Sequence, residues 1–231
     1  MSAVQPISDW RALARTIDHT LIRTDGTREA VVKLCDEALH YGFHTVSVQP
    51  CQIALVASML RGSQVLTGSV VGFPQGATLT TVKQFEAAEV MRLGAQELDM
   101  VLNIAALKSG DHDSVANDIK AVAHVAHDGG AILKVIIETP LLTREEKVLA
   151  CELCLKGGAD YVKTATGMAG GGAAVEDVRL MRSVVGKRAG VKAAGGIRTA
   201  ADAAAMLAAG ADRLGTSASV AIMHELGAPG M

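Results

Sequence analysis

The chain repeats one pattern eight times: a short run typical of a β-strand is followed by a longer run typical of a helix, at intervals of about 25 to 30 residues. Strands that alternate with helices form parallel sheets, and eight such units close into a barrel. The prediction is therefore an α/β fold, a TIM (β/α)8 barrel with a short N-terminal lead helix near 8–13. A doubly wound open sheet is the alternative, but such sheets usually have five or six strands. The predicted strands span 14–22, 44–50, 63–76, 96–103, 131–139, 158–167, 190–196 and 211–217.

Composition is consistent with a single barrel domain over 1–231. Hydrophobic residues make up 49% and aromatic residues only 3%, which indicates a large aliphatic core. The formal net charge is −2 without a basic block, which argues against nucleic-acid binding as the main activity. No run resembles a signal peptide or a membrane helix, so we expect a cytoplasmic protein with reduced thiols. The cysteines are Cys35, Cys51, Cys151 and Cys154.

Cys151 and Cys154 form a CxxC motif in a helical pattern. The spacing places both thiols on one helix face, where they are interpreted as small buried hydrophobic side chains. A zinc site would need a second ligand pair, and none has suitable spacing. The sequence therefore predicts neither a metal nor a cofactor.

A lysine in the predicted sixth strand is followed directly by a glycine-rich segment, in YVKTATGMAGGG (161–172). An ammonium group in an apolar wall must lose its charge or find a partner. A lysine with a lowered pKa is a nucleophile that forms a Schiff base with a carbonyl compound. Glycine-rich loops favour anions, because their backbone N–H groups approach a phosphate closely. The segment indicates Lys163 as an amine nucleophile for a phosphorylated carbonyl substrate.

Strand alternation predicts which polar side chains point into the barrel. Asp99, Lys163 and Lys192 point inward on the fourth, sixth and seventh strands. Neighbouring parallel strands lie about 4.8 Å apart, so the two ammonium groups repel and one pKa falls. Asp99 offsets charge and serves as a proton donor or acceptor. The alternative, in which these residues are only ion-pair partners, stays open at this point.

Other titratable residues allow more than one interpretation. Lys134 points inward as a counter-ion or as a catalytic group. Asp18, near the end of the first strand, joins a water-mediated proton relay or caps a turn. His19 faces the helices, in the core or an interface. Lys83 and Lys108 fall in helical or loop patterns and are predicted to be solvated.

Three loops with small residues are candidate phosphate contacts. In this fold the loops after strands seven and eight usually hold phosphate, next to a helix N-terminus. Arg198 either adds positive charge there or forms a surface ion pair. The candidate segments are Thr166-Gly167 with the following glycines, Gly195-Gly196, and Gly215-Thr216-Ser217.

Several motifs together resemble those of the deoxyribose-phosphate aldolase family. DYVKTATG, GGGAAVEDVRLMR and GVKAAGGIRT carry the resemblance, and TIDHTL, VVGFPQG, ELDMVLN, LKVIIET and RLGTS fit in the same order. The resemblance extends from about Ile17 to Ser217. It implies a class I aldolase on a TIM barrel that works without a metal. The implied reaction is reversible cleavage of 2-deoxy-D-ribose 5-phosphate to D-glyceraldehyde 3-phosphate and acetaldehyde, in deoxyribonucleoside and deoxyribose phosphate catabolism.

The resemblance also implies roles for individual residues. Lys163 is the Schiff-base lysine, Lys192 lowers its pKa and exchanges protons, and Asp99 transfers protons, with Asp18 a candidate for the relay. The expected partners are a phosphorylated sugar and aldehydes, with no nucleic acid or membrane, and family members are commonly homodimers or homotetramers. The implied phosphate contacts are Gly167, Gly195, Gly196, Arg198, Gly215 and Ser217.

The chain departs from the family pattern at several positions, where rate and phosphate affinity are expected to differ. Met168 stands where some members carry a phosphate-binding lysine, and Ala169 replaces a loop glycine. Ala218 takes the place of a second serine. Ser47 stands where a cysteine is frequent, and we hypothesise that it spares the enzyme a thiol that aldehydes trap. The sequence ends LGAPGM, without the tyrosine that reaches the site in some members.

Two other functions stay open. One is a Schiff-base aldolase for a different phosphorylated sugar. The other is a barrel that binds a phosphorylated metabolite without cleaving a carbon–carbon bond, and the combination of Lys163, Lys192 and Asp99 argues against it.

Overall fold

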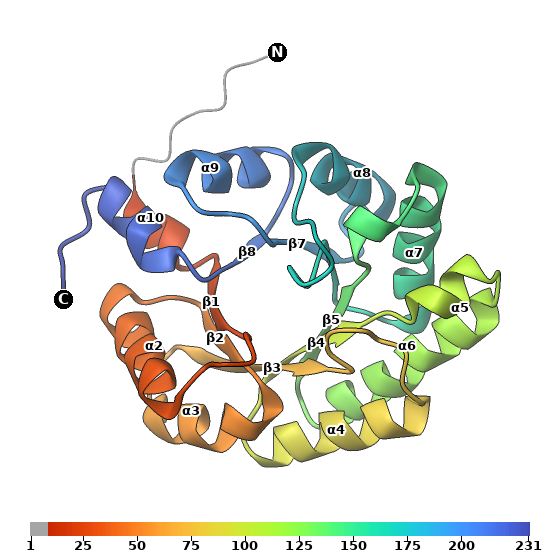
Figure 1. The fold of residues 1–231 in the computed structure, drawn as a ribbon, viewed down its shortest axis with the longest axis horizontal. Coiled ribbons are helices and arrows are strands. Elements are labelled where there is room, and N and C mark those ends of the chain that lie inside the picture. The colour runs from red at the N-terminus through yellow and green to blue at the C-terminus, as the bar shows by residue number, and fades with distance from the viewer. Residues whose placement is uncertain (1–8) are drawn as a thin grey trace.

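The computed structural model describes residues 9–231, in which eight parallel strands form a closed barrel (Figure 1). The strands pair in chain order, and the last returns to the first, with Asp18 opposite Gly215. The closed sheet confirms the predicted TIM barrel and rules out a doubly wound open sheet. The strands are β1 (Ile17–Leu21), β2 (Thr45–Val48), β3 (Leu66–Val71), β4 (Glu97–Val101), β5 (Ile132–Ile136), β6 (Tyr161–Lys163), β7 (Gly190–Ala194) and β8 (Arg213–Thr216).

Helices surround the barrel as an outer ring (Figure 1). Thr143 and Thr199 begin their helices with capping boxes, and Gly42 and Gly158 end theirs in the left-handed conformation. The helices are α1 (Trp10–Ala14), α2 (Arg28–Tyr41), α3 (Ile53–Met59), α4 (Thr80–Arg92), α5 (Ile104–Lys108), α6 (His112–Asp128), α7 (Arg144–Gly157), α8 (Val175–Val185), α9 (Ala200–Ala208) and α10 (Ser219–Glu225), with short 3₁₀ turns η1 (Pro50–Gln52) and η2 (Thr139–Leu141).

The predicted lead helix is α1, which packs against α10 beside the barrel. Asp9 caps it, because its side chain accepts a hydrogen bond from the Arg11 N–H. The predicted start at Ser8 lies outside the described residues. The short helix α5 was not predicted. Asn103 caps it, because its side chain accepts a hydrogen bond from the Ala106 N–H.

The main apolar core lies between the strands and the helices. Leu98, Met100 and Leu102 belong to it and are fully buried, on the face of β4 opposite to that of Asp99. The barrel interior is therefore left to the opposite face of each strand, where the charged residues gather. Within residues 9–231 no helix combines the length and the apolar composition that a membrane crossing requires.

Lys83 on α4 contradicts its prediction as a solvated residue. Its side chain is fully buried, and its Nζ lies 2.5 Å from Asp118 Oδ2 on α6. The same amine donates a 3.0 Å hydrogen bond to the Val101 carbonyl at the end of β4. A buried ammonium is tolerated when it is paired and hydrogen-bonded. The partner is remote in the sequence, so the local helical pattern could not reveal it.

Candidate active site

Asp99 on β4 is the centre of a network of buried ion pairs inside the barrel. Its Oδ2 accepts hydrogen bonds from Lys163 Nζ on β6 at 2.7 Å and from Lys192 Nζ on β7 at 2.6 Å. Its Oδ1 accepts from Lys134 Nζ on β5 at 3.0 Å. Lys192 Nζ also lies 2.5 Å from Asp18 Oδ2 on β1. The structure thus brings together the four residues predicted as catalytic, Lys163, Lys192, Asp99 and Asp18.

A second set of contacts continues this network deeper in the barrel. Arg213 on β8 pairs with Asp18, and its guanidinium donates to Glu97 Oε2 at 3.0 Å. Lys134 Nζ lies 2.7 Å from the same Glu97 oxygen. Thr45 donates to Glu97 and accepts from Arg213. Asp18 therefore pairs with three cations, Lys134, Lys192 and Arg213, rather than capping a turn.

Sequence reasoning did not single out Glu97 or Arg213. The signal for Glu97 was available, because it shares the parity of Asp99 on the same strand and therefore points inward. Arg213 is the first residue of β8 and follows a helix-to-strand turn, so the strand pattern alone did not indicate that it points into the barrel. Its pairing partner Asp18 lies 195 residues away in the sequence.

The pKa of Lys163 is lowered to about 8. Burial is the largest cause, because the charged amine loses its hydration. The nearby positive charges of Lys192 and Lys134 act in the same direction, while the Asp99 carboxylate opposes them without outweighing burial. At neutral pH a useful fraction of Lys163 is therefore an uncharged nucleophile.

The other two shifted groups near Lys163 keep their charges. Burial raises the pKa of Asp99, but the lysines at 134, 163 and 192 outweigh it and hold that pKa well below its usual range. Burial lowers the pKa of Lys134, but the carboxylates of Asp99 and Glu97 outweigh it and raise that pKa. Lys134 therefore stays protonated, and of its two interpretations the counter-ion is the one that fits.

The charge count of the barrel interior explains why Lys163 loses its proton more easily than an ordinary lysine. Each charged residue of the network is at most 5% exposed. Isolated charges are costly to bury, so an interior of this kind favours equal numbers of each sign. With Lys163 neutral, three cations face three carboxylates. The cations are then Lys134, Lys192 and Arg213, and the carboxylates are Asp18, Glu97 and Asp99.

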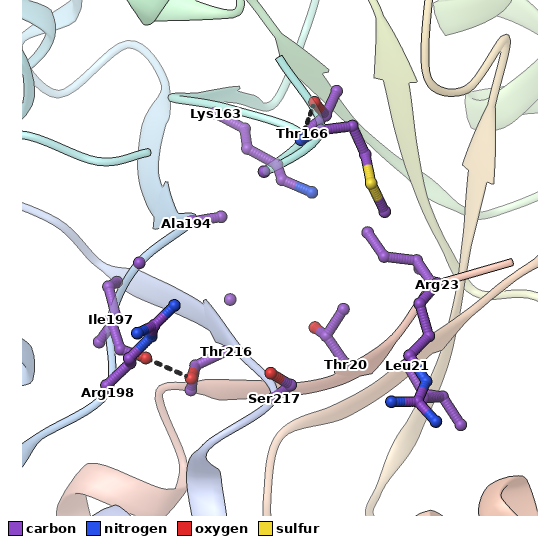
Figure 2. A pocket seen from close by; sticks show the side chains of 16 residues that line it. Thr20, Leu21, Arg23, Lys163, Thr166, Ala194, Ile197, Arg198, Thr216 and Ser217 are labelled. Atoms are coloured by element: carbon purple, nitrogen blue, oxygen red, sulfur yellow. Dashed lines mark hydrogen bonds between the residues drawn. The ribbon is translucent and has the colours of Figure 1, made fainter. Parts of the chain in front are cut away.

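Lys163 opens onto a cavity of about 240 Å³ at the carboxyl ends of the strands (Figure 2). The loops after β1, β6, β7 and β8 form its walls, which is where this fold usually carries its active site. All six residues predicted to contact phosphate line this cavity. The lining residues are Thr20, Leu21, Ile22, Arg23, Lys163, Thr166, Gly167, Met168, Ala194, Gly195, Gly196, Ile197, Arg198, Gly215, Thr216 and Ser217.

Several backbone N–H groups along the cavity are available to an anion. In the described part of the chain, the N–H groups of Gly167, Gly195, Gly196 and Ser217 have no hydrogen-bond acceptor. Gly167, Gly195 and Gly196 also have positive φ angles, from 78° to 93°, which suit glycine. Turns of this kind form concave anion sites from backbone N–H groups.

Gly215 contributes through its small size. A Cβ at this position would lie 2.9 Å from the Ala194 Cβ and 3.1 Å from the Lys192 Cε. Even a methyl group would therefore press on Ala194 and on the Lys192 side chain. Gly215 links the phosphate side of the cavity to the position of the second lysine.

Two arginines line the cavity from different loops (Figure 2). Arg198 forms no ion pair with any residue of 9–231, although its backbone N–H donates to Asp202. A surface ion pair is thus not what holds Arg198. Arg23, which the sequence interpretation missed, pairs with Asp25 at 2.8 Å and is largely exposed. Arg23 lies in the loop after β1, where no local sequence motif indicated that it lines the cavity.

The departures from the family pattern lie at different distances from the cavity. Met168 lines it and is 48% exposed, whereas Ala169 and Ala218 do not line it. Ser47 is buried in β2 beside Thr20. His19 faces the helices as predicted, and its ring nitrogens bond to Glu37 on α2 and to Ser219 on α10.

The thiols at positions 151 and 154 are free and buried, and burial raises the pKa of Cys151 to about 12 and that of Cys154 well above its usual range. Such thiols are unreactive. No set of three or more His, Cys, Asp or Glu side chains within 9–231 is arranged to hold a metal ion. The carboxylates of the interior are instead occupied by lysine and arginine.

Comparison with known proteins gives the same picture over almost the whole chain. The model of the DeoC/LacD family aldolases matches residues 12–224. The deoxyribose-phosphate aldolase of Thermococcus gammatolerans is 56% identical over 92% of this chain and 95% of its own length. That of Thermococcus kodakarensis is 56% identical over 95% of this chain and 98% of its own.

A solved structure agrees with these relatives. The tetrameric deoxyribose phosphate aldolase of Aeropyrum pernix superposes with a TM-score of 0.90, at 34% identity, covering 96% of this chain and 94% of that one. Barrel, buried lysines and family match thus agree, and the chain belongs to the DeoC/LacD family of aldolases.

Proposed function

We propose that this protein is a class I aldolase that reversibly cleaves 2-deoxy-D-ribose 5-phosphate to D-glyceraldehyde 3-phosphate and acetaldehyde, in deoxyribose phosphate catabolism. One observation carries the proposal: Lys163, a buried amine with a pKa of about 8, opens onto a cavity rimmed by unpaired glycine N–H groups. The amine suits an aldehyde carbon, and the N–H groups suit a phosphate. Relatives with this name at 56% identity support the choice of substrate.

The chemistry begins with the uncharged Lys163 amine attacking C1 of the open-chain aldehyde. Loss of water gives an iminium ion, which draws electrons from the C2–C3 bond. When a base removes the proton of the C3 hydroxyl, that bond breaks, C3 becomes the aldehyde of D-glyceraldehyde 3-phosphate, and C2 remains in an enamine. Protonation of C2 and hydrolysis of the iminium then release acetaldehyde and restore the amine.

Asp99 and Lys192 handle protons in this scheme. Asp99 Oδ2 holds both amines within 2.7 Å, so a proton moves between Lys163 and Lys192 through one oxygen. Asp18 lies 2.5 Å from Lys192 and extends the relay away from the cavity. Forming the iminium ion from the uncharged amine takes up one proton, with which the oxygen of the carbinolamine leaves as water, and these residues supply that proton within hydrogen-bond distance.

The phosphate is held at the glycine-rich side of the cavity. The N–H groups of Gly167, Gly195, Gly196 and Ser217 donate to its oxygens, and Arg198 adds a positive charge. Gly215 has no side chain and therefore leaves space in the cavity wall beside Lys192. This division places the aldehyde end at Lys163 and the anionic end over the loops after β6, β7 and β8.

The active form is a cytoplasmic homodimer or homotetramer of a single barrel domain. A tetrameric relative with a TM-score of 0.90 supports self-association. Leu79, Val82 and Phe85 form an exposed apolar face at the start of α4, with exposures of 71%, 47% and 69%. Large apolar side chains grouped on a surface often mark an interface. A second copy of the chain is its expected partner, and Phe85→Asp should lower the molar mass measured by light scattering.

Borohydride trapping tests the proposed function directly. Acetaldehyde with borohydride should leave an ethyl adduct on Lys163, detected by peptide mass spectrometry. Lys163→Met should remove it, and the exposed Lys187→Met should not. An unmodified Lys163 in the active-site peptide would sink the Schiff-base mechanism. An adduct without cleavage of deoxyribose phosphate would favour an aldolase for a different phosphorylated sugar.

A further inference from the structure

Glu138 has a backbone conformation that its residue type seldom adopts. It follows β5 at the carboxyl end of the barrel, and its φ of 56° makes it the one non-glycine residue within 9–231 in the left-handed region. Residues other than glycine, asparagine and aspartate pay a conformational cost there and persist only where their surroundings enforce it. The neighbouring Thr139 N–H enforces it by donating to the Thr164 carbonyl at 2.8 Å.

The Glu138 side chain is buried and has a single kind of partner. It is 2% exposed, and both carboxylate oxygens accept from the Thr166 N–H at 3.2 Å. No ion pair to Glu138 is formed by the residues that the structure describes. Burying a carboxylate without a cation is costly, so we expect this contact to have a function in the segment that it binds. Among residues 9–231, the Glu138 side chain forms hydrogen bonds only with the loop that follows Lys163.

The contact decides which N–H group of that loop is left free. Glu138 occupies the Thr166 N–H, and the Thr166 hydroxyl accepts from the Met168 N–H at 3.0 Å, the dashed bond at Thr166 in Figure 2. Gly167, between them, has no acceptor in the described chain and lines the cavity. The two bonds on either side therefore fix the turn that carries the Gly167 N–H at the cavity.

We infer that Glu138 is a positioning residue that presents the Gly167 N–H to the anionic end of the substrate. It touches neither the substrate carbonyl nor the reacting amine; it acts through the Thr166 to Met168 turn. The inference rests on the proposed function, because it assigns a determinant of phosphate recognition in that same cavity. It predicts that Glu138 governs affinity for phosphorylated ligands rather than amine chemistry.

The experiment compares Glu138→Ala and Glu138→Gly with the wild-type protein, using Glu152→Ala, exposed on α7, as the control. Inorganic phosphate is the binding probe, measured by titration calorimetry, which needs no activity. Kinetics are measured with 2-deoxyribose 5-phosphate and with unphosphorylated 2-deoxyribose. Thermal melting and the acetaldehyde–borohydride adduct on Lys163 report folding and amine chemistry.

We expect Glu138→Ala to raise the phosphate Kd and the KM for the phosphorylated sugar about tenfold, the effect of one misplaced hydrogen bond to a charged group. The kcat/KM for 2-deoxyribose should change less than about twofold, since that substrate lacks the anion. Glu138→Gly, which adopts the left-handed backbone freely, should lose the same phosphate affinity while melting at a higher temperature than Glu138→Ala.

Two results would overturn the inference. One is wild-type phosphate affinity in Glu138→Gly, because the backbone conformation and not the carboxylate would then matter. The other is an equal loss on both sugars, which a general structural role produces. Failure of the proposed function has a separate signature: the wild-type protein would give no Lys163 adduct, whatever the phosphate Kd of the variants.

Discussion

Replacing Lys192 by methionine should raise the pKa of Lys163 and suppress its reaction at neutral pH. In the native protein the two ammonium groups share one oxygen, Asp99 Oδ2, at 2.6 and 2.7 Å. Methionine has a similar length without charge, so Lys163 becomes the only amine on that oxygen. The interior then holds three carboxylates against two permanent cations, and protonation of Lys163 restores the balance. Both effects favour the ammonium form.

The magnitude follows from the fraction of neutral amine. With a pKa of about 8, about 9% of Lys163 is neutral at pH 7. At its ordinary value of 10.5, the neutral fraction is about 0.03%. The rate of Schiff-base formation at pH 7 should therefore fall up to about 300-fold.

The assay is the initial rate of reductive ethylation of Lys163 by acetaldehyde and cyanoborohydride, followed by mass spectrometry from pH 6 to 11. The wild-type rate should rise with pH around a midpoint near 8, since only the deprotonated amine attacks. In Lys192→Met the midpoint should rise from about 8 toward the ordinary value of 10.5 without reaching it, because burial still disfavours the charged amine, and comparable rates at the highest pH show that the site is still folded. A variant midpoint at or below that of the wild type would refute the electrostatic role of Lys192.

Three further changes test other parts of the molecule. The pKa of Lys163 is lower in the folded than in the unfolded chain, so the stability of the fold rises with pH between about 8 and 10.5, and the full cost of burying the ammonium group is present below about 8. Lys163→Met should therefore raise the free energy of unfolding at pH 7 by about 1–3 kcal/mol in urea titrations. A loss of stability would contradict the cost assigned to burying the charge. Lys83→Met leaves the buried Asp118 without its cation and should lower the free energy of unfolding by about 3–5 kcal/mol. The double variant with Asp118→Leu should recover most of this loss, and no recovery would mean that the broken ion pair does not cause it. Arg198→Ala should raise the KM for 2-deoxyribose 5-phosphate about tenfold without changing adduct formation by acetaldehyde, and an unchanged KM would remove Arg198 from the phosphate site.

The fold and the inward direction of the polar residues could be predicted because both depend on short-range periodicity. Alternation on a strand has a period of two, so the parity of Asp99 placed it opposite Leu98 and Met100, and the structure agrees. The helix α5 was not predicted because it is short and lies in the loop after β4, and because its capping residue, Asn103, is also typical of a strand end. Lys83 was misjudged because its burial depends on Asp118 of another helix.

By itself, the sequence determined the barrel, the facing of Lys163 and Lys192 into it, and the glycine-rich loops at one end. These properties follow from the period of each strand and from which residues tolerate a left-handed backbone, and both act within a few residues. The tertiary structure decided which charges meet. Asp18 contacts Arg213 from the other end of the chain, and Glu138, which follows β5, contacts Thr166, which follows the neighbouring strand β6. The lowered pKa of Lys163 belongs to this second group, because desolvation and Coulomb forces depend on distances of a few ångströms between strands.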